Sequence, residues 1–180
     1  MHRLFVALRP PPEIRALLIA AMGGVPRARW QDDEQLHLTL RFIGEVDRPQ
    51  AEDIAAALGQ VHAEAPEIAI AGVGRFDKAG RTDSIWAGVT PRQPVAELHA
   101  RVDRALAQAG VAPDRRAFLP HITLARLPRT AGAEAAIARF VAERAGLSSA
   151  PFTPAALLLF ESRLGHEGAR YEAVARYPFA

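Results

Sequence analysis

Two tetrapeptides, His37-Leu38-Thr39-Leu40 and His121-Ile122-Thr123-Leu124, share one pattern and lie in different halves of the chain. Each carries a histidine and a threonine two residues apart, and each of these is followed by an apolar residue. Side chains of a strand point alternately to its two faces, so the histidine and threonine would share one face while the apolar pair faces the core. The pattern therefore predicts two strands that each present an imidazole beside a hydroxyl.

The segments around the tetrapeptides alternate between strand and helix patterns. The predicted strands are 3–8, 37–43, 67–74, 84–89, 121–127, 156–164 and 171–177, and the predicted helices are 10–22, 51–62, 95–109 and 133–145. Gly44 is expected to end the second strand, and 76–83 is expected to form a hairpin loop. Each histidine-bearing strand is followed by a helix and two strands, which suggests two similar lobes.

This order predicts an α+β fold with two pseudo-symmetric lobes, each an antiparallel sheet flanked by helices, and an active-site cleft between them. No low-complexity segment or linker separates the two halves, so residues 1–180 are expected to form a single bilobal domain. We expect the protein to be a monomer.

The composition excludes several classes of site. The chain is 49% hydrophobic and 23% charged, which is typical of a globular protein. It has no cysteine, so disulfides, a thiol nucleophile and cysteine-ligated metal centres are excluded. No export signal and no apolar run of membrane-spanning length is found, and we expect a cytoplasmic protein without membrane contact.

The positive charge is carried almost entirely by arginine. The net charge is only +2, yet the isoelectric point is about 9.6, because Lys78 is the only lysine among the 22 basic residues. The arginines are scattered along the chain and form no basic run, so compositional drift explains them better than a nucleic-acid-binding patch. Arginine nevertheless offers planar, bidentate recognition of phosphate wherever it lies in a site.

Two imidazoles and two hydroxyls that converge in a cleft would suit the cleavage of a phosphodiester. A neutral imidazole can take a proton from water, and a protonated one can give a proton to a leaving oxygen. Threonine hydroxyls can donate hydrogen bonds to the non-bridging oxygens, where negative charge accumulates. This chemistry needs no metal, cofactor or nucleophilic side chain, and we expect none.

The context of the tetrapeptides resembles the 2H phosphoesterase superfamily. The segments LHLTLRFIGEV at 36–46 and FLPHITLAR at 118–126 are similar to its two extended motifs. The opening RLFVA at 3–7 and the segments FESR at 160–163 and GARY at 168–171 are similar to its first strand and closing hairpin. The likeness is greatest to the RNA 2′,3′-cyclic phosphodiesterase branch, also described as 2′-5′ RNA ligase-like.

The resemblance implies a function and a set of site residues. His37 and His121 would be the catalytic pair, Thr39 and Thr123 would bind the phosphate, and Arg126 would contact the phosphate or base. The reaction would open the 2′,3′-cyclic phosphate of an RNA end or nucleotide and leave a 2′-phosphomonoester. The resemblance also implies a reversible 2′-5′ RNA ligase activity at the same site. We assign His37 as the acid for the 3′ oxygen and His121 as the base for water, although the two roles could be exchanged.

Simple strand alternation conflicts with one of these residues. Arg126 is five residues after His121 and would point to the opposite face unless a bulge or the strand end re-aims it. By alternation alone, Arg41 would lie beside His37 and Thr39, and we keep it as a lesser candidate.

Two other functions are compatible with the sequence: a non-catalytic module that binds nucleotides or RNA ends, and a phosphodiesterase for a small cyclic nucleotide. The four remaining histidines are expected to lie outside the site, and the acidic stretch 32–34 is expected to be a solvated loop rather than a metal site.

Overall fold

The computed structural model describes residues 1–129 and 132–180 and shows an α+β fold. The elements are β1 (His2–Leu8), α1 (Pro12–Ala21), β2 (Arg29–Trp30), β3 (Leu38–Val46), α2 (Arg48–Leu58), β4 (Ala69–Lys78), β5 (Arg81–Thr90), α3 (Gln93–Gln108), β6 (His121–Arg126), α4 (Glu134–Glu143), β7 (Ala156–Gly165) and β8 (Gly168–Pro178). None of the helices in these two ranges is both long and apolar enough to cross a membrane.

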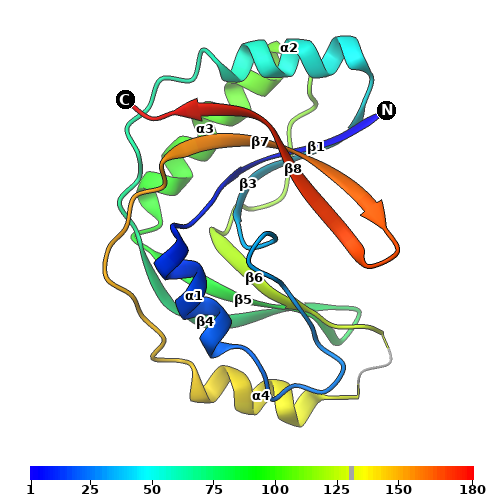
Figure 1. Cartoon of the computed structure of the whole chain (residues 1–180), viewed down its shortest axis with the longest axis vertical. Helices are drawn as coiled ribbons and strands as arrows, with labels where there is room; N and C mark the ends of the chain where they lie inside the picture. The colour runs from blue at the N-terminus through cyan, green and yellow to red at the C-terminus, as the bar shows by residue number, and fades with distance from the viewer. Residues whose placement is uncertain (130–131) are drawn as a thin grey trace.

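The strands form one antiparallel sheet that is divided into two lobes. Its order is β4-β5-β6-β3-β1-β7-β8, and β2 pairs with β6. One lobe contains β1, β3, β7 and β8 with helices α2 and α3; the other contains β2, β4, β5 and β6 with helices α1 and α4 (Figure 1). The predicted two-lobed α+β architecture is confirmed.

The lobes meet where β3 pairs with β6. Leu38 and Ile122 are the paired residues, and each directly follows the histidine of its tetrapeptide. Leu38, Leu40, Ile122 and Leu124 are all buried in one core, as the alternation of the two tetrapeptides predicts. The same pairing therefore buries the apolar residues and brings the two histidine-bearing strand starts together.

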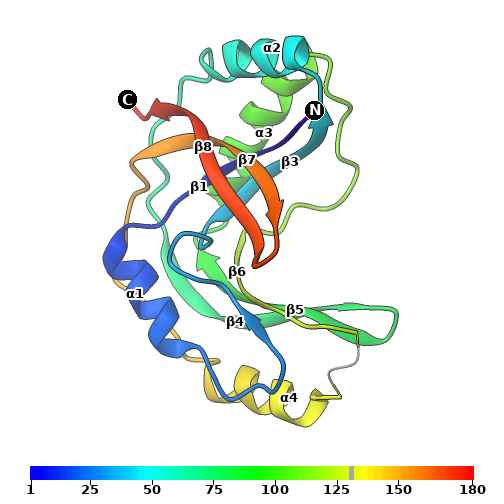
Figure 2. The same ribbon diagram turned by 45° about the vertical axis from the view of Figure 1, so that its right-hand side comes forward.

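Each lobe draws strands from both halves of the chain. After β3 in the first lobe, the chain passes through α2 into β4 and β5 of the second lobe (Figure 2). After β6 in the second lobe, it passes through α4 and returns to the first lobe as β7 and β8. The recurring order of elements predicts two lobes, but it does not predict this exchange.

Two strand boundaries differ from the sequence prediction because glycine and a tight turn allow the strands to continue. Gly44, at φ +94°, lies within β3 and pairs with Leu4 next to a register shift instead of ending the strand. The expected 76–83 loop is mostly strand, and only Ala79 and Gly80 form the turn. Both have positive φ, as a two-residue turn of the type favoured in hairpins requires.

Helix α2 begins and ends earlier than predicted. The Asp47 carboxylate caps its start by accepting a hydrogen bond from the backbone N–H of Gln50 at 2.9 Å. Pro49 fits the first turn, where a missing N–H has no cost, and Gly59 follows the last residue. The two-residue strand β2 has no clear signal in the sequence.

Candidate active site

The two histidines are held in the same way at the starts of β3 and β6. In each, Nδ1 is 2.7 Å from the carbonyl oxygen two residues earlier, that of Gln35 for His37 and that of Leu119 for His121. A carbonyl oxygen can only accept, so Nδ1 carries the hydrogen and donates it. In the neutral imidazole, Nε2 then has the free lone pair.

A bulge follows the threonine in both strands and re-aims the residues beyond it. In the β1–β3 pairing, Ala7 is opposite Thr39 but Val6 is opposite Arg41, so one residue of β3 is extra. In the β5–β6 pairing, Trp86 is opposite Thr123 and Ile85 is opposite Ala125, so one residue of β6 is extra. A bulge reverses the alternation, so the residue three positions after each threonine returns to the threonine's face.

That residue is Phe42 in β3 and Arg126 in β6, and both line the cleft. The bulge offered above as an explanation for Arg126 is therefore present. Arg41 is not part of this lining: it is only 4% exposed, its Nε is 3.1 Å from Oδ1 of Asp103 in α3, and its Nη2 donates to the Ala112 carbonyl oxygen. The expectation that Arg41 lies beside His37 and Thr39 is wrong, because it assumes that the side chains of β3 alternate regularly. The bulge between Thr39 and Arg41 interrupts this alternation.

All five residues assigned by resemblance surround one cleft of about 560 Å³. Its lining consists of Arg3, Phe5, Gln31, His37, Thr39, Phe42, Arg116, His121, Thr123, Arg126, Ser162, Leu164, Ala169 and Tyr171. Among the described residues, this lining includes three arginines and no aspartate or glutamate. The cleft therefore combines two imidazoles and two hydroxyls with a cationic wall that suits an anionic ligand.

Aromatic rings enclose His37. Its ring centroid is 4.9 Å from that of Phe5, 5.2 Å from Tyr171 in an edge-on contact, and 6.2 Å from Phe160. The pKa of His37 is lowered to about 4, chiefly by its burial and to a smaller extent by the charges of Arg126 and His121, while the hydrogen bond to the Gln35 carbonyl oxygen acts in the opposite direction. Nε2 lies 2.9 Å from the Thr39 hydroxyl, which can donate to it when the imidazole is neutral.

His121 has a different aromatic environment. Phe76 meets it edge-on at 4.9 Å between centroids, and Trp86 lies at 5.9 Å. Burial lowers its pKa, and the charge of Arg126 acts in the same direction. Within residues 1–129 and 132–180, no protein group hydrogen-bonds Nε2 of His121, so this nitrogen is available to a ligand or water.

A side chamber of about 270 Å³ adjoins the cleft. It shares Thr39, Phe42, Arg116 and His121 with the cleft and adds Phe76, Phe118 and Asp114, among others. The Asp114 carboxylate accepts from the Arg116 side chain and backbone N–H, which lowers its pKa to about 2. Arg3, Phe5, Phe42, Arg116 and Tyr171 were not assigned to the site from the sequence, because they reach the cleft through pairing, bulges and loops rather than through a local motif.

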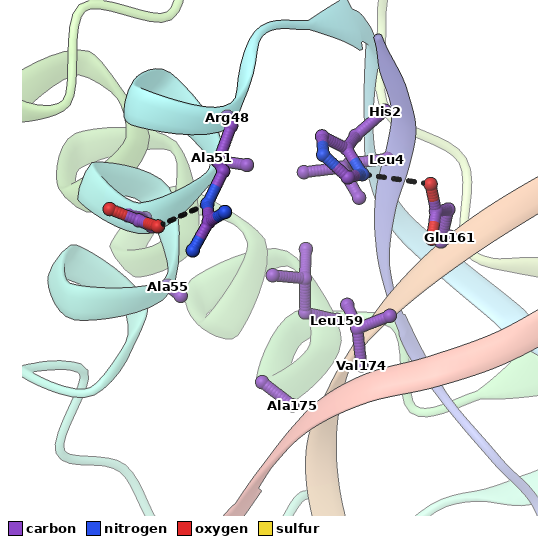
Figure 3. Close-up of a pocket in the computed structure, with 10 residues that line it drawn as sticks. His2, Leu4, Arg48, Ala51, Ala55, Leu159, Glu161, Val174 and Ala175 are labelled. Carbon is purple, nitrogen blue, oxygen red and sulfur yellow. Dashed lines mark hydrogen bonds and ion pairs between the residues drawn. The ribbon is translucent and has the colours of Figure 1, made fainter.

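The other histidines lie outside the cleft. His99 stacks on Phe118 at 4.0 Å and bonds the Leu40 carbonyl oxygen, while His62 and His166 are exposed. His2 lines a separate cavity of about 470 Å³ between α2 and strands β1, β7 and β8 (Figure 3). There His2 pairs with Glu161 at 2.9 Å and Arg48 pairs with Glu52 (Figure 3). This cavity contains none of the assigned site residues.

Relatives with curated names share substantial sequence with this chain. An RNA 2′,3′-cyclic phosphodiesterase of Aeropyrum pernix is 37% identical over 59% of this chain and 61% of its own length. One of Geobacillus stearothermophilus is 29% identical over 88% of this chain but only 50% of its own length. One of Archaeoglobus fulgidus is 31% identical over 71% of this chain and 73% of its own length. The matches to the first two relatives thus span about three fifths and half of those proteins.

Solved structures show the same fold. Escherichia coli LigT complexed with 3′-AMP superposes with a TM-score of 0.77 at 21% identity, covering 99% of this chain and 98% of that one. A structure described as a phosphoesterase gives 0.78 at 22% identity with the same coverage. The family model described as the 2′-5′ RNA ligase superfamily matches residues 8–165, which is most of the sequence. The chain belongs to the 2′-5′ RNA ligase superfamily.

Proposed function

We propose that this protein hydrolyses 2′,3′-cyclic phosphate ends of RNA to 2′-phosphomonoesters, using two histidines and no metal or cofactor. The observation that carries the proposal is the placement of His37 and His121 in one cleft that is lined by arginines and by Thr39 and Thr123. The names of the relatives agree with it, since several are RNA 2′,3′-cyclic phosphodiesterases.

The reaction needs one proton acceptor and one proton donor. His121 Nε2 takes a proton from a water molecule whose oxygen attacks the phosphorus, and His37 gives a proton to the departing 3′ oxygen. The new P–O bond forms as the P–O3′ bond breaks, so the phosphate remains on O2′. The hydroxyls of Thr39 and Thr123 donate to the non-bridging oxygens, and Arg126 balances their charge.

The assigned roles require one imidazole to be neutral and the other to be protonated when the reaction occurs. His121 is neutral at pH 7 with Nε2 available, as a base must be. In the free protein His37 is also neutral, because its pKa is about 4. To act as the acid, His37 must gain a proton when the substrate binds, and the nearby phosphate anion raises its pKa in that complex.

The same site would catalyse ligation, in which a 5′-hydroxyl of RNA replaces water, attacks the cyclic phosphate and displaces the 3′ oxygen, so that a 2′-5′ linkage forms. His121 would again be the base and His37 the acid, and by microscopic reversibility the two roles would be exchanged when the 2′-5′ linkage is cleaved. Water is present at about 55 M, so hydrolysis dominates unless the second RNA end is held in place.

The direct test is to incubate the protein in EDTA with an RNA that ends in a 2′,3′-cyclic phosphate and to identify the product. A 2′-phosphate end supports the proposal. Binding of the RNA without product contradicts it and favours a binding module. Absence of both, with hydrolysis of a small cyclic nucleotide, would identify the smaller compound as the substrate.

A further inference from the structure

Trp86 lies against His121 but does not line the cleft. It is opposite Thr123 in the β5–β6 pairing and opposite Gly74 in the β4–β5 pairing. Its ring centroid is 5.9 Å from that of His121, with an angle of 59° between the planes. Because paired residues on neighbouring strands share a face, the indole lies on the same face as Thr123 and next to the His121 imidazole, but it is not among the residues that line the cleft.

The indole of Trp86 leaves no room for a side chain at position 74. A Cβ at this position would lie 2.4 Å from Cζ2 and Cη2 of Trp86, which is far inside van der Waals contact. The backbone of Gly74 does not have positive φ, so its conformation does not require glycine. Glycine weakens a strand and often marks a place where another group approaches closely. Here the approaching group is Trp86, which lies over the backbone of β4.

Phe76 completes the support. Its ring is 5.2 Å from that of Trp86 and meets the His121 imidazole edge-on at 4.9 Å. The hydrogen bond from Nδ1 to the Leu119 carbonyl oxygen fixes one edge of the imidazole, and the two aromatic rings limit its tilt. Catalytic geometry depends on this kind of support from groups that do not react.

We propose that Trp86 is a positioning residue for His121, and that Gly74 is the residue that allows it to take that position. The inference rests on the proposed function, in which His121 Nε2 removes a proton from water. The plane of the imidazole sets the direction of the Nε2 lone pair, so a loss of support would misdirect it. The indole also excludes water from one side of His121 and thus contributes to the burial that lowers its pKa.

The first test replaces Trp86 with leucine, which is apolar but smaller, and with phenylalanine, which keeps a ring. In Trp86→Leu, kcat should fall about tenfold while KM stays within about twofold, because the lost support matters in the transition state. The pKa of His121, followed by NMR of its imidazole, should rise as water gains access. Trp86→Phe should restore both values in large part.

Trp30→Leu is the matched control. Trp30 is also half-buried in the same lobe, but its ring packs on Phe140 at 5.3 Å in a contact between β2 and α4. This variant should lower the melting temperature without moving the His121 titration. An unchanged His121 titration in Trp86→Leu, or an equal shift in Trp30→Leu, overturns the proposal. The NMR titration does not depend on turnover, so it is separable from a failure of the proposed function.

A double-mutant cycle tests the role of Gly74. Gly74→Ala should displace the indole and lower kcat about tenfold in the otherwise unchanged protein. In the Trp86→Leu background the clash is removed, so the same change should have an effect within about twofold, because contacting residues are energetically coupled. Equal effects in both backgrounds would contradict the link between Gly74 and Trp86.

Discussion

Phe42 and Arg126 occupy equivalent positions in the two lobes, each three residues after the threonine of its tetrapeptide and beyond a bulge that turns it into the cleft. The two residues are equivalent in position but differ in chemistry. Phe42 offers an exposed ring, and Arg126 offers a cation. The two residues should therefore favour different parts of a nucleotide, a base near Phe42 and a phosphate near Arg126.

Replacing Arg126 with alanine should weaken binding more for an RNA end than for a cyclic mononucleotide, because the RNA has additional phosphates. We expect KM to rise about tenfold or more for the RNA, as loss of a charge-assisted bond implies. The slope of log KM against log salt should become smaller. Arg29→Ala is the matched control, since Arg29 is opposite Arg126 in the β2–β6 pairing and does not line the cleft. Equal losses for both substrates would indicate a purely local contact.

Replacing Phe42 with leucine should raise KM for substrates that carry a base. The Phe42 side chain is 42% exposed, and the Arg3 guanidinium carbon lies 5.4 Å from its ring centroid. Stacking on an aromatic ring contributes about 1–3 kcal/mol per base, which corresponds to a rise of about fivefold to 150-fold. A ribose 2′,3′-cyclic phosphate without a base should show little change. A similar loss on that compound would show that Phe42 acts on the phosphate site instead.

The two histidines should be separable by the leaving group. His37→Ala and His121→Ala should each lower kcat at least a hundredfold for the natural substrate, since acid–base catalysis contributes about 10²–10⁴. In a substrate with sulfur in place of the 3′ oxygen, the 3′ thiolate departs without being protonated. Such a substrate should therefore restore turnover to the variant that lacks the acid. Rescue of His37→Ala alone supports the assigned roles, and rescue of His121→Ala alone would exchange them.

The sequence predicts the elements that carry the chemistry better than it predicts their connections. Alternation along His37–Leu40 and His121–Leu124 places two histidines and two threonines on one side and four apolar residues in the core, and the structure agrees. The same rule fails for Arg41, because a bulge depends on the partner strand and leaves no local signal. The exchange of strands between lobes and the aromatic support of Trp86 depend on long-range pairing in the same way.

Acid should destabilise the fold through His37. Its pKa is about 4 in the folded protein and near 6.5 in the unfolded chain, so the unfolded state binds more protons between these values. The unfolding free energy should therefore rise with pH through this window and fall as the pH drops from 6.5 toward 4. Replacing His37 with glutamine removes the titrating group and should flatten the curve in urea unfolding measured at several pH values.

His62→Gln is the matched control for that measurement, because His62 is exposed in the folded protein. The variant removes one histidine but no buried group, so it should keep the slope of the natural protein. Equal flattening in both variants would show that burial of His37 is not the cause of the acid sensitivity. If the slope of unfolding free energy against pH is unchanged in His37→Gln, His37 is not held neutral by its burial beside Phe5 and Tyr171. The requirement that substrate binding must protonate His37 would then also fall.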